Sequence, residues 1–177
     1  MNSSKVKKNL DELNSTLLNE LLNKYSKEAK ISKWDMGASS SRDISVQVQQ
    51  GKAKQLKGSQ RKSMTLRVWN KNNKVGITST SDLTDNGVKK AMRGAIEASI
   101  YGNEKESPEF SSLAKSPLVN LNTKITQDHE IDYLLNILKR AEMKLIESHK
   151  SIDSVPYNGL SESFIERLYI NSDGANR

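Results

Sequence analysis

The chain has 177 residues, 34% of them hydrophobic, a formal net charge of +7 and no cysteine. The absence of cysteine excludes a disulfide framework, a thiolate zinc site and an iron–sulfur cluster, and no apolar run approaches the roughly 20 residues that span a bilayer. The N-terminus also lacks the apolar segment of a signal peptide. We therefore expect a cytoplasmic protein without membrane contact, and the length predicts a single domain over 1–177.

The positive charge is concentrated in one segment. No acidic residue occurs between Asp43 and Asp82, and the eight basic residues there are Lys52, Lys54, Lys57, Arg61, Lys62, Arg67, Lys71 and Lys74. This acid-free segment carries +8, and the remaining 20 basic and 21 acidic residues sum to −1. The charge either steers phosphate or acidic peptide toward the segment or belongs to a solvated sheet face on which lysine guards the strand edges.

An amphipathic helix and a β-meander are predicted for the first half of the chain. Leucines and one tyrosine recur every three to four positions over 9–29, the spacing of a helix with one apolar face. Over 31–81 apolar and polar residues alternate, which is typical of half-buried strands. We expect four or five strands there, arranged as an antiparallel meander that contains most of the acid-free segment.

Turn signals divide the predicted meander. Small and polar residues predict a loop at Gly37–Ser41 and a break at Gly58-Ser59. Gln50-Gly51 and the asparagine-rich Asn70–Asn73 predict tight turns, because asparagine and glycine tolerate positive φ.

Two further helices are predicted in the second half of the chain. Apolar and small residues at helical spacing indicate a helix over 84–101, with Asp82 or Thr84 as its N-cap, and another over 127–149, with Thr126 as its N-cap. The apolar stripe of the second of these helices should be part of the core.

The two helices are joined by a long crossover, and strands follow the second one. Residues 102–126 contain two of the three prolines and predict an irregular segment. Residues 152–171 predict strands, the last of them apolar on both faces and therefore central or covered. Because the sequence stops in a turn directly after that strand, we expect a fragment of a longer protein. The predicted fold is α+β, an antiparallel meander of four to five strands with about three helices packed mainly on one face.

No catalytic or metal-binding constellation is recognisable. His129 begins a sequence similar to the helical zinc motif H-E-x-x-H, but Tyr133 occupies the position of the second histidine. His149 lies at the other end of the same predicted helix, roughly 30 Å away, so the two histidines cannot share a metal ion. We predict no catalytic, metal or cofactor residue within 1–177.

Three residues of the meander are candidates for contact with a peptide or a partner: Lys54, Arg67 and Trp69. They are expected on its polar face, where basic side chains attract acidic groups. A tryptophan among basic residues also suits stacking on a nucleic-acid base, whereas a tryptophan at a strand end commonly packs across strands. No helix combines basic residues with the pattern of a recognition helix, which argues against nucleic acid as the partner.

The order of elements and four segments resemble the N-terminal domain of the TldD/PmbA family, described as modulators of DNA gyrase. The segments are Ile44–Gly51 (ISVQVQQG), Leu66–Ser81 (LRVWNKNNKVGITSTS), the alanine-rich helix that follows, and Arg167–Gly174 (RLYINSDG). The resemblance extends from about Leu10 to the end of the chain. The segment GITSTSDL is more similar to the PmbA (TldE) branch than to the TldD branch.

This resemblance implies a role in proteolysis. Family members are similar to a two-subunit zinc metallopeptidase that cuts unfolded or extended peptides, and the TldD partner carries a zinc-binding H-E-x-x-x-H helix and a cysteine. This sequence has neither, so any zinc is implied elsewhere in the full-length complex, and whether the chain itself is an enzyme stays open.

The implied role is that of a domain which helps to enclose extended peptide and contacts a TldD-type partner subunit or a second copy of itself. The alternatives are a basic nucleic-acid-binding module and a purely structural interaction domain.

Overall fold

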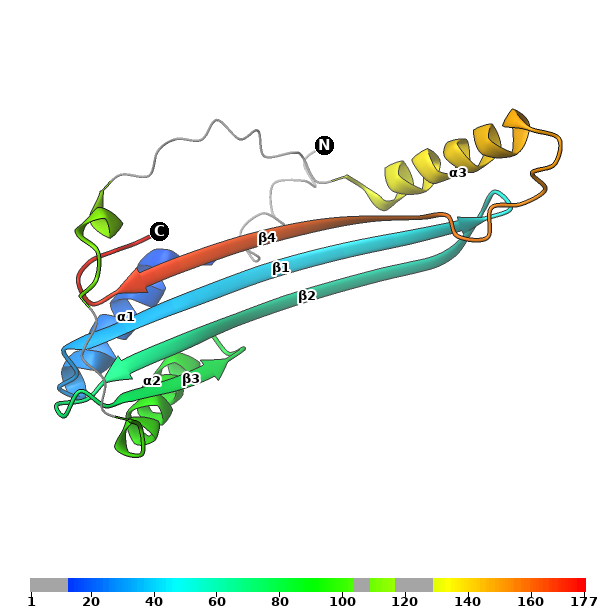
Figure 1. Cartoon of the computed structure of the whole chain (residues 1–177). Coiled ribbons are helices and arrows are strands. Elements are labelled where there is room, and N and C mark those ends of the chain that lie inside the picture. The colour runs from blue at the N-terminus through cyan, green and yellow to red at the C-terminus, as the bar shows by residue number, and fades with distance from the viewer. Residues whose placement is uncertain (1–12, 104–108, 117–128) are drawn as a thin grey trace, which may run out of the picture. The chain divides into compact units, whose positions relative to one another are not determined.

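The computed structural model describes residues 13–103, 109–116 and 129–177 (Figure 1). The elements in chain order are α1 (Ser15–Glu28), β1 (Lys33–Gln49), β2 (Lys52–Trp69), β3 (Val75–Thr80), α2 (Asp85–Ile100), the short 3-10 helix η2 (Ser112–Lys115), α3 (Ile131–Ser148) and β4 (Gly159–Asn171). The four strands form one antiparallel sheet in the order β3-β2-β1-β4. The predicted α+β fold with a four-stranded antiparallel sheet and three α-helices is therefore confirmed.

The chain divides into two compact units. Unit 1 takes its described residues from Met1–Ser40, Arg61–Val119 and Ile165–Arg177, and unit 2 takes them from Ser41–Gln60 and Asn120–Phe164. The strands β1, β2 and β4 each continue from one unit into the other. We describe each unit separately.

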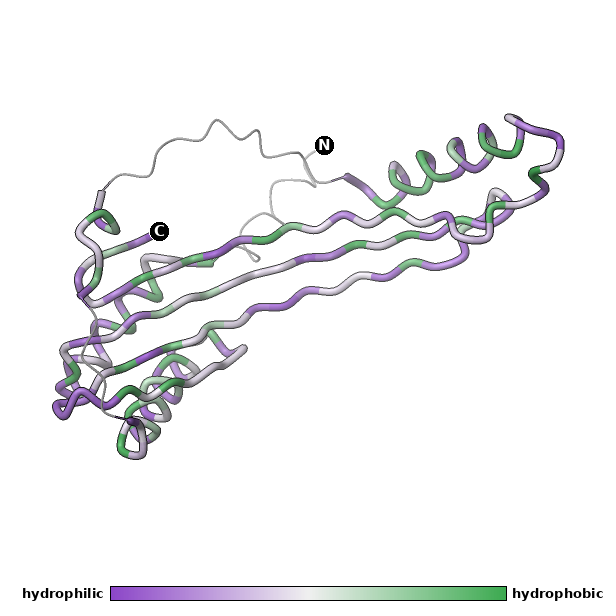
Figure 2. Tube along the Cα trace, in the orientation of Figure 1, coloured by the Kyte–Doolittle hydropathy of each residue, from purple (hydrophilic) through white to green (hydrophobic). Residues whose placement is uncertain are grey.

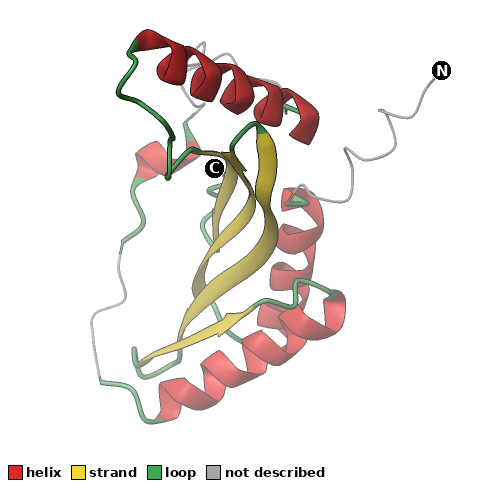
Figure 3. Ribbon diagram, turned by 90° about the vertical axis from the view of Figure 1, so that its right-hand side faces the viewer, coloured by secondary structure: helices red, strands yellow, loops and turns green. Residues whose placement is uncertain are grey.

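Unit 1 is built around one apolar cluster, between a sheet face and the helices α1 and α2 (Figures 1 and 3). Alternate residues of the strands point into it, because successive side chains of a strand face opposite sides. The buried members are Leu13, Leu18, Leu21, Leu22, Tyr25, Trp34, Met36, Ala38, Met64, Leu66, Val68, Val88, Ala91, Met92, Ala95, Leu168 and Ile170. Both helices of unit 1 thus cover the same face of its sheet.

The helix α2 begins at a well-formed cap and packs very closely on β3. Thr84 Oγ1 accepts a hydrogen bond from Gly87 N–H at 3.3 Å, and Asp82 Oδ1 accepts one from the Thr84 hydroxyl at 2.6 Å. Thr84 is therefore the N-cap, one of the two predicted, and Asp82 supports it. A Cβ on Gly76 would lie 1.9 Å from the backbone oxygen of Ala95, so only glycine permits this approach of helix to strand.

Unit 2 has a smaller apolar cluster, formed by Val46 and Val48 of β1 with Leu134 and Leu138 of α3. The expectation that the apolar stripe of α3 is part of a core is confirmed for these leucines. Next to the cluster, the buried Glu142 accepts hydrogen bonds from the backbone N–H groups at the β1–β2 turn.

That turn consists of Gln50 and Gly51, at φ values of +51° and +69°, as expected for a two-residue hairpin connection. The second predicted turn is also present, because Asn70 N–H donates to Lys74 O at 3.0 Å and Asn73 has a positive φ.

Two predicted interruptions of the meander were wrong. Gly37–Ser41 lies inside β1 and Gly58-Ser59 lies inside β2, so residues 31–81 contain two long strands and the short β3 rather than four or five strands. Small polar residues pair through their backbone like any others, and here their side chains also bond across the sheet. Ser39 Oγ lies 3.2 Å from Ser63 Oγ, and Ser59 Oγ donates to Asp43 Oδ2 at 3.2 Å.

The placement of the last strand was also wrong. β4 is an edge strand of the sheet, not a central one, and its apolar Ile165 is 60% exposed. Apolar residues on both faces of the strand predicted a covered position. Phe164 is instead covered by the Arg42 guanidinium, 5.2 Å from its ring centre, and not by a further layer of structure. The strand begins at Gly159, and the preceding Tyr157 is exposed.

Helix ends differ slightly from the predictions. Asn14 caps α1, and positions 9–12 of the predicted helix lie outside the described residues, as do 104–108 and 117–126 of the crossover. α3 begins at Ile131 with Glu130 in the N-cap position, so Thr126, which also lies outside the described residues, is not its cap. The described part of the crossover contains η2.

Candidate peptide-contact site

One face of the unit 1 sheet is not covered by α1 or α2. Because Trp34 and Met36 point toward these helices, Asp35 points to the other side, and the same alternation places Arg67 and Tyr169 there. We call the face formed by Asp35, Arg67, Trp69 and Tyr169 the open face. Two of the three predicted contact residues, Arg67 and Trp69, are thus brought together.

A buried carboxylate organises the open face. Asp35 is 2% exposed, and its Oδ1 accepts a hydrogen bond from Arg67 Nε at 2.8 Å while its Oδ2 accepts from Arg67 Nη2. The Tyr169 hydroxyl donates to the same Oδ2 at 3.3 Å. The fork-like pairing is the geometry in which arginine binds a carboxylate most strongly. Sequence analysis missed Asp35, although a single acid between apolar strand residues was a usable signal.

The network shifts the pKa of both side chains that bind Asp35. Its hydrogen bonds to Asp35 raise the pKa of the Arg67 guanidinium above the ordinary value, and burial raises the pKa of the Tyr169 phenol. Both shifts favour the protonated form, which each group already has at neutral pH. Arg67 still has 48% of its side chain exposed, so part of its guanidinium faces solvent.

Trp69 is a packing residue in this structure. Its side chain is buried, and its ring meets Phe110 edge-on at 6.1 Å, while the Arg67 guanidinium lies 5.5 Å from its centre. Lys33 Nζ in turn lies 4.2 Å from the centre of the Phe110 ring and 3.4 Å from Asp173 Oδ2. A tryptophan covered in this way is not available to stack on a base.

The third predicted contact residue, Lys54, lies in unit 2 and not in unit 1 with the other two. It is exposed on β2. The sequence placed all three on one polar face because it divided β2 into two strands at Gly58-Ser59.

The outer edge of β3 borders the open face and is one of the two edges of the sheet. Ladder bonds alternate along an antiparallel pair, and Asn70 N–H donates to Lys74 O. With the register Val68↔Gly76 and Leu66↔Thr78, the backbone groups of Val75, Ile77 and Ser79 therefore point outward.

Part of this edge is open. A Cβ on Gly102 would lie 2.2 Å from Val75 O, so that carbonyl is covered. No described strand pairs with the outward groups of Ile77 and Ser79. Ile77 is also 54% exposed and lies directly opposite Arg67.

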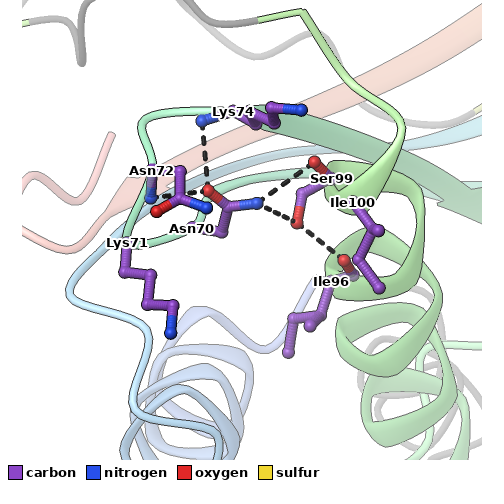
Figure 4. A pocket seen from close by; sticks show the side chains of 7 residues that line it. All are labelled: Asn70, Lys71, Asn72, Lys74, Ile96, Ser99 and Ile100. Carbon is purple, nitrogen blue, oxygen red and sulfur yellow. Dashed lines mark hydrogen bonds between the residues drawn. The ribbon is translucent and has the colours of Figure 1, made fainter.

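A hollow of about 260 Å³ lies where the β2–β3 turn meets the end of α2 (Figure 4). Its polar centre is Asn70, whose Nδ2 donates to Ser99 O and Ser99 Oγ at 3.1 Å each, while its Oδ1 accepts from the backbone of Asn72 and Lys74. Because these groups satisfy one another, the hollow has a structural role and offers no unpaired donor or acceptor of Asn70 to a ligand.

The two histidines lie at opposite ends of α3, as predicted. His129 Nδ1 is 2.8 Å from Glu162 Oε1, and its ring stacks on Tyr133 at 4.6 Å. His149 is the C-cap, and its Nδ1 accepts from Ser151 N–H. Among the described residues, no group of three or more His, Asp or Glu side chains is arranged to hold a metal ion. The described residues therefore do not fit a zinc site.

A comparison with protein families finds a match for the segment that contains Asp35, Arg67 and Trp69 of the open face. Residues 34–99 match domain 1 of the PmbA/TldA metallopeptidases. This stretch includes β1, β2 and β3 and most of α2. Over this segment the match confirms the resemblance to the N-terminal domain of the TldD/PmbA family that was inferred from the sequence. Among curated proteins no sequence matches significantly.

Solved structures share the fold. TldE from Thermococcus kodakarensis is 18% identical with a TM-score of 0.72, over 90% of this chain and 36% of its own. A candidate DNA gyrase modulator from Bacteroides thetaiotaomicron is 14% identical with a TM-score of 0.66, over 92% and 37%. One from Thermotoga maritima is 12% identical with a TM-score of 0.64, over 92% and 36%. The chain thus spans little more than a third of these proteins.

None of the helices in the described ranges combines the length and the apolar composition needed to cross a membrane.

Proposed function

We propose that the chain is the N-terminal domain of a PmbA/TldE-like subunit of a TldD/PmbA metallopeptidase complex. In this role it helps to enclose extended peptide substrates and contacts the partner subunit, either a TldD-type chain or a second copy. The observation that carries the proposal is the match of residues 34–99 to domain 1 of this family. The assignment to the TldE branch rests on the sequence of the segment GITSTSDL.

The edge of β3 supports a peptide-binding role. An extended peptide can join an exposed edge as an additional strand, and its main-chain hydrogen bonds then give affinity that depends little on sequence. The outward groups of Ile77 and Ser79 are suited to such pairing because no described strand occupies them. The exposed Ile77 side chain offers an apolar contact beside this edge.

We assign the chemistry of peptide cleavage to another part of the full-length complex. The described residues hold no metal-ligand group, and Arg67 is bound to Asp35 rather than free to act on a substrate. Zinc, where the complex contains it, would therefore be bound outside the described residues of this chain. Nucleic acid is disfavoured as the partner because Trp69 is buried and Arg67 is paired.

The test is a proline at position 77 of the full-length subunit, co-expressed with a TldD-type partner. Ile77→Pro removes an outward N–H without removing a ladder bond to β2, and proline is tolerated on edge strands for this reason. Ile77→Val, which keeps the N–H, is the matched control. With an unstructured fluorogenic peptide, we expect Ile77→Pro to lower kcat/KM about two- to tenfold, since a hydrogen bond contributes about 0.5–1.5 kcal/mol.

Size-exclusion chromatography separates the two parts of the proposal. If the subunits fail to assemble, the subunit role is wrong. If they assemble and Ile77→Pro cleaves the peptide as fast as Ile77→Val, the edge of β3 is not on the peptide path.

A further inference from the structure

The first seven residues of β2 form an unusual stretch within unit 2. Every residue of Lys52–Gly58 is exposed, whichever side of the strand its side chain faces. The apolar cluster under α3 uses residues of β1, α3 and β4 and none of β2. Lys52–Gly58 therefore adds nothing to the unit 2 core and is positioned through its pairing with β1.

No described strand pairs with the outer edge of this stretch. β2 lies between β1 and β3 in the sheet, but β3 pairs only with Met64–Trp69. No described strand therefore covers the backbone groups along the outer edge of Lys52–Gly58. An edge of this length is a template for pairing with another extended chain.

The side chains beside this edge are basic. Lys52, Lys54 and Lys57 form no ion pair with any residue in the described ranges. Leu56, 52% exposed, lies among them. Along β2, Figure 2 shows hydrophilic segments interrupted by hydrophobic ones. Alternation along the strand places Lys52, Lys54 and Leu56 on one face and Lys57 on the other.

Lysine also guards edge strands against aggregation, but this role does not explain the whole stretch. Charged side chains, short strands, twist and cover are separate ways to guard an edge, and none of them calls for an exposed apolar residue. Here seven consecutive exposed residues include an apolar leucine in the middle of the basic residues. A hydrophobic contact flanked by cations is what an acidic, extended partner would use.

We propose that the outer edge of Lys52–Gly58 binds an extended acidic polypeptide segment as an added strand. Carboxylates of the segment pair with Lys52 and Lys54, an apolar residue contacts Leu56, and backbone hydrogen bonds continue the sheet. This site is distinct from the edge of β3 and does not depend on the proposed peptidase role. It also gives Lys52 and Lys54, two of the eight basic residues of the acid-free segment, a partner of defined chemistry.

The experiment measures binding of a fluorescein-labelled peptide to the 177-residue chain, by anisotropy at near-physiological salt. In this glutamate peptide, glutamate alternates with threonine and one leucine near the end supplies the apolar contact for Leu56. The variant Lys52→Glu/Lys54→Glu is compared with Lys71→Glu/Lys90→Glu, an exposed pair elsewhere with the same change in net charge. We expect the first variant to weaken binding about tenfold or more and the second to change it less than about twofold. Leu56→Ser should weaken binding by a smaller factor while leaving every charge in place.

Amide hydrogen exchange identifies the mode of binding. Strand addition should protect amides within Lys52–Gly58 when the glutamate peptide is bound. The proposal is overturned if no peptide binding is detected, if both double variants lose affinity equally, or if the amides of β2 are not protected. It is also overturned if single-stranded oligothymidylate competes as well as the glutamate peptide, because the stretch would then be a general polyanion surface.

Discussion

The two units are stabilised in different ways. In unit 1, seventeen buried apolar residues from two helices and the sheet form one cluster. In unit 2, the described cluster has four, and much of the remaining organisation is polar: Glu142 binds the β1–β2 turn, and Glu162 binds His129. Because hydrophobic burial is the largest favourable term in folding, unit 1 should hold most of the stability, and unit 2 should open more readily.

The units also satisfy their buried carboxylates differently. Asp35 of unit 1 is neutralised by a side-chain cation, Arg67, together with the Tyr169 hydroxyl. Glu142 of unit 2 is satisfied by two backbone N–H groups and forms no ion pair with a cationic side chain of the described residues. A carboxylate bound to backbone fixes a turn, whereas one bound to arginine fixes side chains on a face. Glu142 therefore stabilises the β1–β2 hairpin, whereas the Asp35–Arg67 pair orders side chains on the open face.

The largest expected effect comes from matched truncations in the two cores. Leu22→Ala in unit 1 should lower the free energy of unfolding by about 3–5 kcal/mol, since Leu22 is fully buried in the larger cluster. Leu138→Ala in unit 2 should cost about 2 kcal/mol, because the smaller cluster can collapse around the gap. Urea denaturation gives both values. Equal losses would show that the units are equally dependent on apolar burial.

Removing the cation of the open face should have an intermediate effect. Arg67→Met leaves the Asp35 carboxylate buried with only the Tyr169 hydroxyl, and we expect a loss of about 2–3 kcal/mol. This lies below the cost for a fully buried pair because the Arg67 side chain is half exposed.

The double variant Asp35→Asn/Arg67→Met distinguishes the energy of the ion pair from the cost of leaving one of its charges buried alone. It should recover part of the stability lost in Arg67→Met, since no charge is then left buried without a partner. Thermal melting of the single and double variants completes the cycle. A double variant less stable than Arg67→Met would contradict the assigned role of Arg67.

Local patterns predicted the unit 1 elements well and the length of the strands poorly. The stripes of α1 and α2, the Thr84 cap and both turns follow from nearest-neighbour chemistry, which sequence carries directly. Gly37–Ser41 and Gly58-Ser59 were misassigned because a strand's neighbours decide whether small polar residues stay paired, and those neighbours are distant in sequence. The hydrogen bonds of Ser39 with Ser63 and of Ser59 with Asp43 could not be predicted from either segment alone.

The candidate site was predictable only in part, for a similar reason. Arg67 and Trp69 are two residues apart on one strand, so their shared face follows from the period of two. Asp35, Phe110 and Tyr169 reach them from other parts of the chain, and it is these three that determine whether Arg67 is free and Trp69 exposed. The sequence of one strand therefore located the candidate site, but it did not show that Arg67 is paired and that Trp69 is buried.

The smallest expected effect tests whether polar anchoring rather than apolar burial holds the unit 2 hairpin. Glu142 accepts from Gln50 N–H at 2.8 Å and from Gly51 N–H at 2.7 Å. Glu142→Gln keeps the shape but sets an amide NH₂ against one of these donors, so we expect a loss of about 1–2 kcal/mol. Glu147→Gln, on the exposed side of the same helix, is the matched control and should change stability by less than about 0.5 kcal/mol.

Amide exchange shows where that loss falls. In Glu142→Gln the amides of the β1–β2 turn should exchange faster, while those of α2 in unit 1 keep the exchange rate of the unmodified chain, since local opening need not involve the larger core. Faster exchange throughout α2 would mean that the two units unfold together and that the contrast between them has no thermodynamic counterpart. Unchanged exchange at Gln50 and Gly51 would mean that the turn is held by its own backbone conformation rather than by Glu142.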